Sequence, residues 1–346
     1  MEIETLDAVL KYLRTKKNRQ VHLLLGNGFS IAFDSKIFSY NSLHDFISKT
    51  AEQDLSRVLG VIDSKNFEEV MRYLDKFVAL LDAFSDKSDL SKRIASLKAK
   101  LERGLLDAVQ SLHPEHVFSL EQAQQKSCSR FLMQFLDAGG KIFSSNYDLL
   151  LYWVLLRTSG IRHCDGFGRD LENPEEVKLG GDEHWSNLRW GKHRDEQNVF
   201  YLHGALPIFD NGIDVEKEEY TDGRYLLTNI SERMDRGEYP IFVTAGNGRQ
   251  KLEQIMHNRY LSYCYERFCE LTGSLVTFGF NFGPYDDHFI EAINKAANQR
   301  LPNRLWSIYI GVYSAADKAH IEQIADKFAC KVHLFDAKSV DVWGTR

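Results

Sequence analysis

The sequence lacks both paired cysteines and long apolar runs. Its five cysteines form no Cys-x-x-Cys pair, which argues against a zinc ribbon or a disulfide framework and suits reduced thiols in the cytoplasm. No window reaches the roughly 18 apolar residues of a membrane span, and residues 1–20 contain no apolar core of a signal peptide. We therefore expect a soluble, cytoplasmic protein.

An excess of positive charge is also missing. The net charge of -6 argues against strong direct binding of nucleic acid by this chain alone. The basic cluster at 16–19 can contact an anion, but a solvated face is the favoured interpretation. With 346 residues, the chain is long enough for one large domain or two smaller ones.

Short apolar runs recur along the chain and predict strands. Because most of them are apolar throughout rather than alternating, they are typical of a parallel sheet covered on both faces. Helical patterns lie between several of them, at 149–156, 252–271 and 287–297. This alternation predicts an α/β fold with a Rossmann-like, doubly wound, mostly parallel sheet. The predicted strands are 21–25, 141–145, 199–202, 241–244, 274–280, 307–312 and 331–335.

More than a hundred residues separate the first two of these strands, far more than one crossover helix needs. Apolar residues at helical spacing predict two long antiparallel helices there, joined by 85–89. We interpret 1–346 as a single domain with a core at about 20–48 and 131–346 and an α-helical subdomain inserted at about 49–130. A lid over the site and a packing or oligomerisation surface are both open roles for this insertion.

The most informative turn follows the first predicted strand. It reads Gly26-Asn27-Gly28-Phe29-Ser30 and leads into a helical pattern. Glycines let a backbone approach a pyrophosphate, and a helix N-terminus offers free N–H groups. However, Ile31 stands where the usual dinucleotide fingerprint has a third glycine, and the chain has no Gly-Lys-Ser/Thr of an ATPase phosphate loop. An ordinary strand-to-helix turn remains the alternative.

Three further strand ends carry polar or glycine residues. Asn146 and Asp148 follow the second strand, His203 follows the third, and Gly279 and Asn281 end a later one. Ligands in open α/β sheets bind beyond the carboxyl ends of the strands. We therefore expect these residues and the glycine turn to form one site.

Each of these residues also has a structural alternative. Asn146 and Asp148 are equally expected as turn or N-cap residues of the next helix. His203 can be an interior histidine with its hydrogen bonds satisfied. Asp286 and Asp287 can cap the helix predicted at 287–297. The order of all four segments along the chain favours a functional role.

That order resembles the sirtuin-like family. A Gly-x-Gly-x-Ser turn, an Asn-x-Asp loop, a His-Gly pair and a glycine-rich strand end follow one another in residues near 21 to 336. Here they read Gly26-Asn27-Gly28-Phe29-Ser30, Asn146-Tyr147-Asp148, His203-Gly204 and Gly279-Phe280-Asn281. The sequences Ser-Asn-Tyr-Asp, Leu-His-Gly and Gly-Phe-Asn-Phe look closest to bacterial sirtuin-like proteins of antiphage defence systems. The deacetylase branch typically holds a zinc with two Cys-x-x-Cys pairs, which this chain lacks, so a deacetylase role is in doubt.

The resemblance implies hydrolysis of NAD+, the substrate, to ADP-ribose and nicotinamide without a metal, as an effector that depletes NAD in abortive infection. It implies that Asn146 holds the nicotinamide ribose and the attacking water, and that Asp148 orients the carboxamide or the Asn146 loop. His203 would take a proton from a ribose hydroxyl or from water. The irregular stretch 165–197 would close over the nicotinamide end. The implied NAD-binding residues are Gly26, Asn27, Gly28, Phe29, Ser30, Ser145, Gly279 and Asn281.

Other functions remain open at this point. The chain could be an NAD-dependent deacylase or ADP-ribosyltransferase, or a non-catalytic NAD- or ADP-ribose-binding subunit of a larger complex. A dinucleotide oxidoreductase is disfavoured by Ile31 and by the lack of an acidic residue after a nearby second strand.

A constantly active NAD hydrolase would kill its host, so its activity must be controlled. The resemblance implies control by homo-oligomerisation or by a partner protein such as a DNA-translocating ATPase or a short argonaute. We expect no membrane partner.

Overall fold

Six of the predicted strands, together with β1, form a seven-stranded parallel sheet with the order β1-β12-β11-β10-β2-β3-β6. The computed structural model describes residues 2–16, 19–38, 53–62, 67–84, 89–159, 162–169, 187–219, 225–243, 247–300 and 303–345. Six of the seven strands were predicted; the exception is the short, exposed edge strand β1. The bounds are β1 Ile3–Thr5, β2 Val21–Leu25, β3 Ile142–Ser144, β6 Val199–Tyr201, β10 Gly273–Phe278, β11 Leu305–Val312 and β12 Lys331–Asp336.

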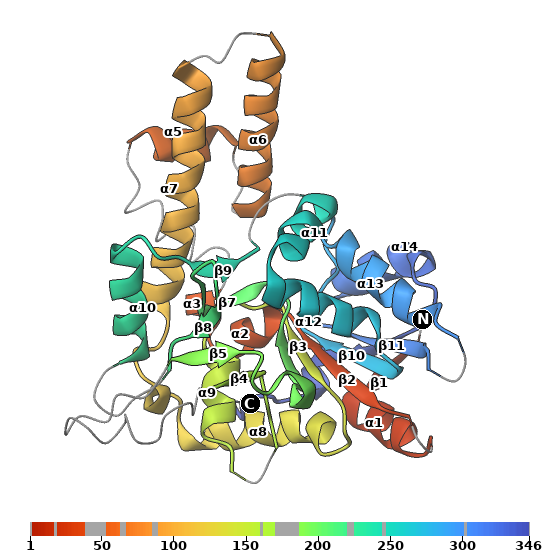
Figure 1. The fold of residues 1–346 in the computed structure, drawn as a ribbon. Helices are drawn as coiled ribbons and strands as arrows, with labels where there is room; N and C mark the ends of the chain where they lie inside the picture. Colours follow the sequence, from red (N-terminus) through yellow and green to blue (C-terminus); the bar gives the residue numbers. More distant parts are fainter. Residues whose placement is uncertain are drawn as a thin grey trace, which may run out of the picture.

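Helices cover both faces of this sheet, which makes the fold a Rossmann-like, doubly wound α/β fold. Figure 1 shows α1 (Leu6–Arg14) and α8 (Gln122–Leu136) on one side, with α12 (Arg259–Cys269) and α13 (Asp287–Ala297) on the other. The chain runs from β2 toward β3 and later from β10 toward β12, so right-handed crossovers place the two sets of helices on opposite faces. The central strand β2 is buried at every residue, which explains its continuous apolar run. Further helices near the sheet are α2 Gly28–Phe33, α9 Leu150–Leu156, α11 Gly248–His257 and α14 Ala315–Ile324.

The single helix predicted at 252–271 is wrong, because the chain forms two helices there, α11 and α12. Asn258 lies between them in an extended conformation. Its side-chain oxygen accepts hydrogen bonds from the N–H groups of Tyr260 and Leu261, both at 3.0 Å. An N-cap asparagine satisfies the free amides of a new helix start, so α12 begins in a new direction.

A second, antiparallel sheet was not predicted. Its order is β4-β5-β8-β7-β9, and the expectation that 241–244 joins the parallel sheet is wrong because β9 pairs with β7 instead. Thr244 and residues 170–186 of the predicted irregular stretch lie outside the described residues. Short strands with charged residues, such as the buried Val-Glu-Lys of β8, give no apolar pattern to detect. The bounds are β4 Phe167–Gly168, β5 Leu188–Trp190, β7 Gly204–Asp210, β8 Val215–Lys217 and β9 Pro240–Phe242.

The two long helices expected before β3 are present as α6 (Phe67–Phe84) and α7 (Asp89–Leu112). They lie side by side, with α5 (Gln53–Ile62) beside them (Figure 1). Residues 85–88 of the predicted connection lie outside the described residues. The three helices share a small apolar cluster of their own, separate from the main core. That these helices form an inserted subdomain stays a prediction.

Candidate functional site

A pocket of about 780 Å³ lies at the carboxyl ends of the parallel strands. Four neighbouring strands, β10, β2, β3 and β6, each lead into residues that line it. The chain changes its direction of travel across the sheet between β2 and β10, which is where open α/β sheets bind their ligands. The volume of the pocket is also in the usual range for a small-molecule site.

Most of the residues predicted for the site meet at this pocket. Eight of the eleven line it: Asn27, Gly28, Ser145, Asn146, Asp148, His203, Gly279 and Asn281. Gly26, Phe29 and Ser30 are not among the lining residues. Phe29 is 1% exposed and packs in the core, and Ser30 lies behind the pocket wall with no exposed surface.

The glycine turn packs against another backbone rather than standing open. The N–H of Gly28 donates to the carbonyl oxygen of Gly279 at 2.9 Å, and a Cβ on Gly28 would lie 2.5 Å from the Gly279 Cα. The N–H groups of Phe29 and Ser30 donate to the carbonyls of Gly26 and Asn27. The expectation of free amides on these three residues is therefore wrong, and the close approach of two strand ends explains the glycines.

At the pocket wall, three side chains form a chain of hydrogen bonds. Asn146 Nδ2 donates to Ser30 Oγ at 3.0 Å, and Ser30 Oγ donates to Asp148 Oδ2 at 2.5 Å. The second carboxylate oxygen of Asp148 accepts the N–H of Leu150 at 2.9 Å. Asp148 thus serves the start of α9 and also orients Ser30, which in turn orients Asn146.

Burial governs the acidity of this carboxyl. Asp148 is 7% exposed, and burial raises its pKa above the ordinary value, while the hydrogen bonds from Ser30 and Leu150 work in the opposite direction. The Asn146 Nδ2 atom donates to Ser30, and its Oδ1 atom accepts no hydrogen bond from the described residues. Asn146 itself lines the pocket, which makes that oxygen a candidate acceptor for a hydroxyl or a water molecule.

His203 stands between the two sheets. It follows β6 of the parallel sheet and immediately precedes Gly204, the first residue of β7. Gly204 has a φ of +80°, and a Cβ there would lie 1.8 Å from the Ile241 carbonyl oxygen. The glycine of the His-Gly pair is therefore required by the bend and by the approach of β9.

The ring of His203 is 4% exposed and borders the pocket. Its Nε2 atom is 2.9 Å from Nε2 of His288. Burial, His288 and the nearby Lys251 hold the pKa of His203 well below 6.5. The imidazole is therefore neutral at pH 7.

Several lining residues were not found from the sequence. Residues from Ala337 to Thr345 form one wall, where Trp343 Nε1 donates to the Phe29 carbonyl at 2.9 Å. These two residues are 314 positions apart, so no local pattern could connect them. Asp286, left uncertain by the sequence, lines the pocket and pairs with the fully buried Lys251 at 3.4 Å. Asp287 is not a lining residue; its carboxylate lies 3.4 Å from Lys327 Nζ.

The pocket is acidic in its charged groups. Asp148, Asp286, Asp317 and Asp341 line it, and the described lining residues include no lysine or arginine. Anionic groups of a ligand would have to be bound there by neutral side chains and by the backbone.

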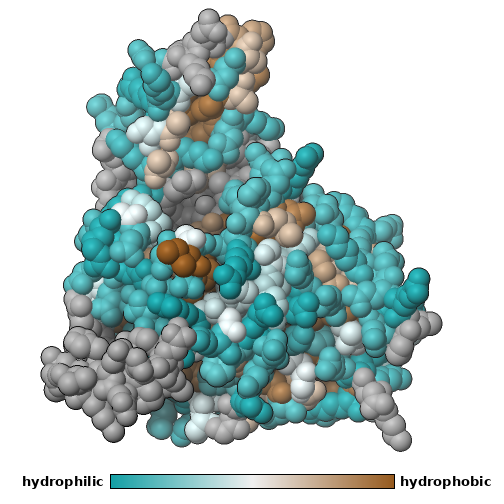
Figure 2. Space-filling model, viewed as in Figure 1, coloured by the Kyte–Doolittle hydropathy of each residue, from teal (hydrophilic) through white to brown (hydrophobic). Residues whose placement is uncertain are grey.

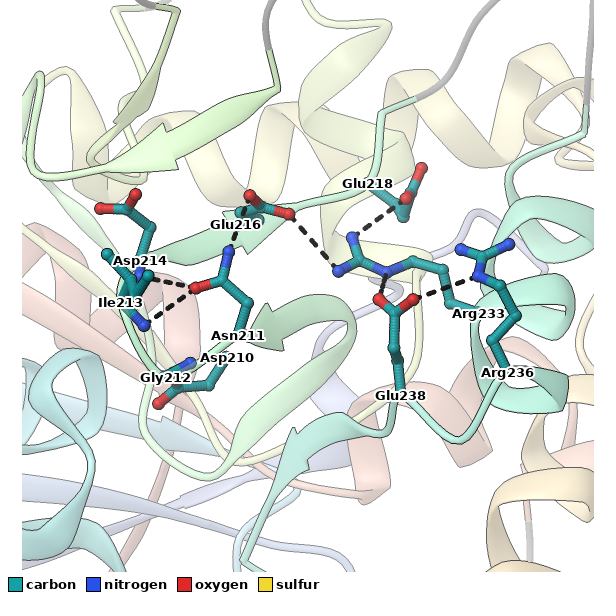
Figure 3. Close-up of polar contacts among 10 residues, drawn as sticks. All are labelled: Asp210, Asn211, Gly212, Ile213, Asp214, Glu216, Glu218, Arg233, Arg236 and Glu238. Carbon is teal, nitrogen blue, oxygen red and sulfur yellow. Dashed lines mark hydrogen bonds and ion pairs between the residues drawn. The ribbon is translucent and has the colours of Figure 1, made fainter.

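A second polar cluster lies away from this pocket (Figure 3). The guanidinium of Arg233 on α10 (Leu226–Asp235) pairs with Glu238 at 2.7 Å, Glu218 at 3.1 Å and Glu216 at 3.4 Å. Because Arg233 is 8% exposed and its donors are used within the chain, the cluster reads as an attachment of α10 to β8 rather than a ligand site.

Two further findings bear on the expectations from sequence. Within the described ranges, no group of three or more His, Cys, Asp or Glu side chains is arranged to hold a metal ion. Among the helices described there, none is long and apolar enough to cross a membrane.

Comparisons with known proteins give a family but no activity. A comparison with curated proteins gave no match. The model of a family described as a domain of unknown function, DUF4917, matches residues 23–343, which include every residue of the candidate site discussed above except Thr345 at its rim. The chain therefore belongs to the DUF4917 family.

Proposed function

We propose that this protein hydrolyses NAD+ to ADP-ribose and nicotinamide. One observation carries the proposal: the hydrogen-bonded chain Asn146–Ser30–Asp148 and the neutral His203 meet at one pocket, at the edge of the sheet where dinucleotides bind. The resemblance of the four strand-end segments to sirtuin-like NAD hydrolases supports the same reaction.

The reaction needs little acid catalysis. The bond between C1′ of the ribose and the nicotinamide nitrogen breaks, and its electron pair leaves with neutral nicotinamide. A water oxygen forms the new bond to C1′, and the proton released by that water passes to a base and then to solvent. Positioning the water and stabilising the positive charge on the ribose are the main tasks of the protein.

In this proposal Asn146 positions the reactants. Its Oδ1 atom would accept a hydrogen bond from the attacking water or from a ribose hydroxyl, while Ser30 holds its Nδ2 atom in place. Asp148 is only 7% exposed, and its two carboxylate oxygens accept hydrogen bonds from Ser30 and from the N–H of Leu150. We therefore assign it an orienting role.

His203 would take the proton. Its depressed pKa keeps the ring neutral, so that a lone pair is available at pH 7, although a weak base accepts a proton only as the transition state develops charge. Among the described residues, Nδ1 is the ring nitrogen without a hydrogen bond, because Nε2 is engaged by His288.

The test is the loss of NAD in purified variants. We expect His203→Ala and Asn146→Ala to reduce NAD turnover by at least about 100-fold while the circular dichroism spectrum stays that of the wild type. Nucleotide chromatography would identify ADP-ribose and nicotinamide as products. Turnover at the wild-type rate in both folded variants would remove these residues from the mechanism.

A non-catalytic NAD- or ADP-ribose-binding subunit is the second candidate. The near-complete burial of His203, with one ring nitrogen engaged, favours it. Calorimetric binding of NAD+ without consumption, both alone and with the product of a neighbouring gene, would support this candidate and exclude hydrolysis.

The biological role we propose is NAD depletion in bacterial antiphage defence, controlled by self-association. The support for self-association is an apolar stripe on α6 formed by Tyr73, Phe77, Leu80 and Phe84, which are 45%, 47%, 57% and 87% exposed. Figure 2 shows apolar surface in the region of α6 and the helices beside it. The spacing of four, three and four residues is that of helix-to-helix packing, and it is nearly symmetric about its centre, which suits a second copy of the same helix.

A further inference from the structure

His203 and His288 form a buried pair across the pocket wall. Their Nε2 atoms are 2.9 Å apart, and their rings are nearly parallel, with centroids 5.2 Å apart. His203 is 4% and His288 1% exposed. The two residues come from different elements, the junction of β6 and β7 and the first turn of α13.

A contact of this length between two nitrogens requires one proton between them. Burial lowers the pKa of His288 to about 3 and holds that of His203 well below 6.5, so both rings are neutral at pH 7. One ring must then carry its proton on Nε2 and the other on Nδ1. The tautomer of each histidine therefore determines that of the other.

The surroundings of His288 select one of the two arrangements. Its Nδ1 atom is buried without a well-formed hydrogen bond. The backbone carbonyl of Tyr285 nevertheless interacts with the ring and raises the pKa of His288, which partly offsets the larger lowering of that pKa by burial. A carbonyl oxygen favours a proton on the nitrogen that faces it. With its proton on Nδ1, His288 accepts at Nε2, and His203 donates from Nε2.

The backbone around His288 is fixed on two sides. The hydroxyl of Tyr265 donates to the His288 carbonyl at 3.0 Å. At the start of α13, Asp286 accepts the N–H of Gly283 at 3.0 Å and pairs with Lys251. The acceptor on His288 is therefore held by the packing of α11, α12 and α13 and does not depend on a ligand.

We propose that His288 is a positioning residue that fixes the tautomer of His203, so that Nδ1 of His203 carries a lone pair for the substrate. The catalytic consequence of this inference rests on the proposed NAD hydrolysis, whereas the assignment of the tautomer does not rest on it. When His203 takes the proton of the attacking water on Nδ1, the resulting imidazolium keeps its Nε2 hydrogen bond to neutral His288. No bond to His288 forms or breaks.

Two substitutions separate positioning from packing. His288→Gln places an amide oxygen near the position of Nε2 and can still accept the hydrogen bond, whereas His288→Leu fills similar space and cannot. We expect the leucine variant to lose about 10- to 100-fold in kcat with a KM within about threefold of wild type, and the glutamine variant to stay within about fivefold in kcat. His333→Leu, whose ring stacks on Tyr309 in the sheet, is the control and should retain wild-type kinetics.

A second measurement reports the tautomer without relying on activity. In two-dimensional ¹H–¹⁵N spectra of histidine-labelled full-length protein, assigned by comparison with His203→Gln, we expect His203 as the Nε2–H tautomer in the wild type and in His288→Gln. In His288→Leu we expect a mixture of tautomers. An Nδ1–H tautomer in the wild type, or a leucine variant with wild-type kcat, overturns the inference.

The two proposals fail in different ways. If the wild type consumes no NAD but His203 is the Nε2–H tautomer, hydrolysis is wrong and the pairing stands. If the wild type consumes NAD and His203→Ala does not, while His288→Leu is fully active, the positioning role alone is wrong.

Discussion

The hydroxyl of Ser30 donates to a carboxylate oxygen of Asp148 at 2.5 Å, and these residues are 118 positions apart in the chain. The bond joins the first turn of α2 (Gly28–Phe33) to the loop after β3. It holds the buried carboxyl of Asp148 at the pocket wall, where Asn146 also lies, so that the two most distinctive sequence segments act as one unit.

Replacement of Ser30 by alanine is expected to remove that unit. Asp148 would lose a donor in a buried site, which costs about 1–3 kcal/mol in the free energy of unfolding, and Asn146 Nδ2 would lose its acceptor. We expect NAD turnover to fall by about 10-fold or more. Urea denaturation and NAD consumption of Ser30→Ala should both be compared with Ser262→Ala, whose hydroxyl bonds only to its own helix. An unchanged rate in the folded Ser30→Ala variant would contradict the orienting role.

Acidification is expected to loosen the loop that carries Asp148. His113 Nε2 accepts the N–H of Leu149 at 3.0 Å, and burial lowers the pKa of His113 from 6.5 to about 4. The unfolded chain binds a proton below pH 6.5 that the folded state does not, so the free energy of unfolding falls as the pH drops through this window. From pH 7 to pH 5 the loss from His113 is roughly 2 kcal/mol.

Urea denaturation at pH 7 and pH 5 measures this effect. In His113→Gln, whose amide oxygen can still accept from Leu149, the fall in stability should be smaller than in the wild type by roughly 2 kcal/mol. His22, with a pKa lowered to about 3, remains in both proteins and acts in the same direction. Equal pH dependence in the two proteins would show that His113 is not a neutral buried group.

The acidic lining is expected to discriminate against NADP+. The resemblance to sirtuin-like proteins implies that Gly279 and Asn281 line the adenosine side of the NAD+ site, and Asp317 and Asp341 line the same pocket. An added phosphate carries nearly two negative charges at pH 7, and their repulsion should lower kcat/KM for NADP+ by roughly 10-fold or more relative to NAD+.

The variant Asp341→Asn tests the cause of that preference. We expect this variant to bring the kcat/KM for NADP+ closer to the kcat/KM for NAD+, chiefly by raising the value for NADP+. The effect of the substitution should be smaller at high salt, because salt screens the repulsion between the carboxylate and the added phosphate. Equal use of both dinucleotides by the wild type would contradict this assignment.

Removal of the Trp343 ring is expected to weaken both the fold and ligand binding. The ring is 1% exposed and lies 4.9 Å from the ring of Phe29. Trp343→Ala should lower the free energy of unfolding by about 3–5 kcal/mol and raise the Kd for NAD+. Trp343→Phe keeps an aromatic ring but loses the hydrogen bond to the Phe29 carbonyl and part of the buried ring volume, so a smaller loss of about 1–2 kcal/mol is expected. Thermal unfolding and calorimetric binding compare the two, and equal effects would contradict a packing role for the wall.

Charges on the apolar stripe of α6 are expected to prevent self-association. The double variant Phe77→Asp/Leu80→Asp changes exposed residues, so its monomeric fold should be retained. Sedimentation velocity at several concentrations should show a larger species for the wild type and a monomer for the variant. The control is Lys76→Ala, which changes a charged residue of the same helix and leaves the apolar side chains of the stripe in place. A monomeric wild type at all concentrations would contradict assembly through α6.

Much of the fold was determined by local sequence patterns. Apolar runs and helical spacing are properties of neighbouring residues, so six strands of the parallel sheet, both long helices and α13 were predicted from sequence alone. The antiparallel sheet was not, because four of its five strands are only two or three residues long, and β8 carries the buried charged residues Glu216 and Lys217, whose burial depends on partners such as Arg233. The break at Asn258 was missed because both flanking segments have the same helical pattern.

The candidate site divides in the same way. The sequence by itself determined that Asn146, Asp148, His203 and Gly279 follow buried strands, and parallel pairing brings such strand ends to one edge. Only the tertiary structure decided that Ser30 lies behind the wall, that the glycines pack against each other, and that His288 and Trp343 complete the pocket. These contacts join residues 85 to 314 positions apart, and side-chain packing between elements, which no local periodicity encodes, selects them.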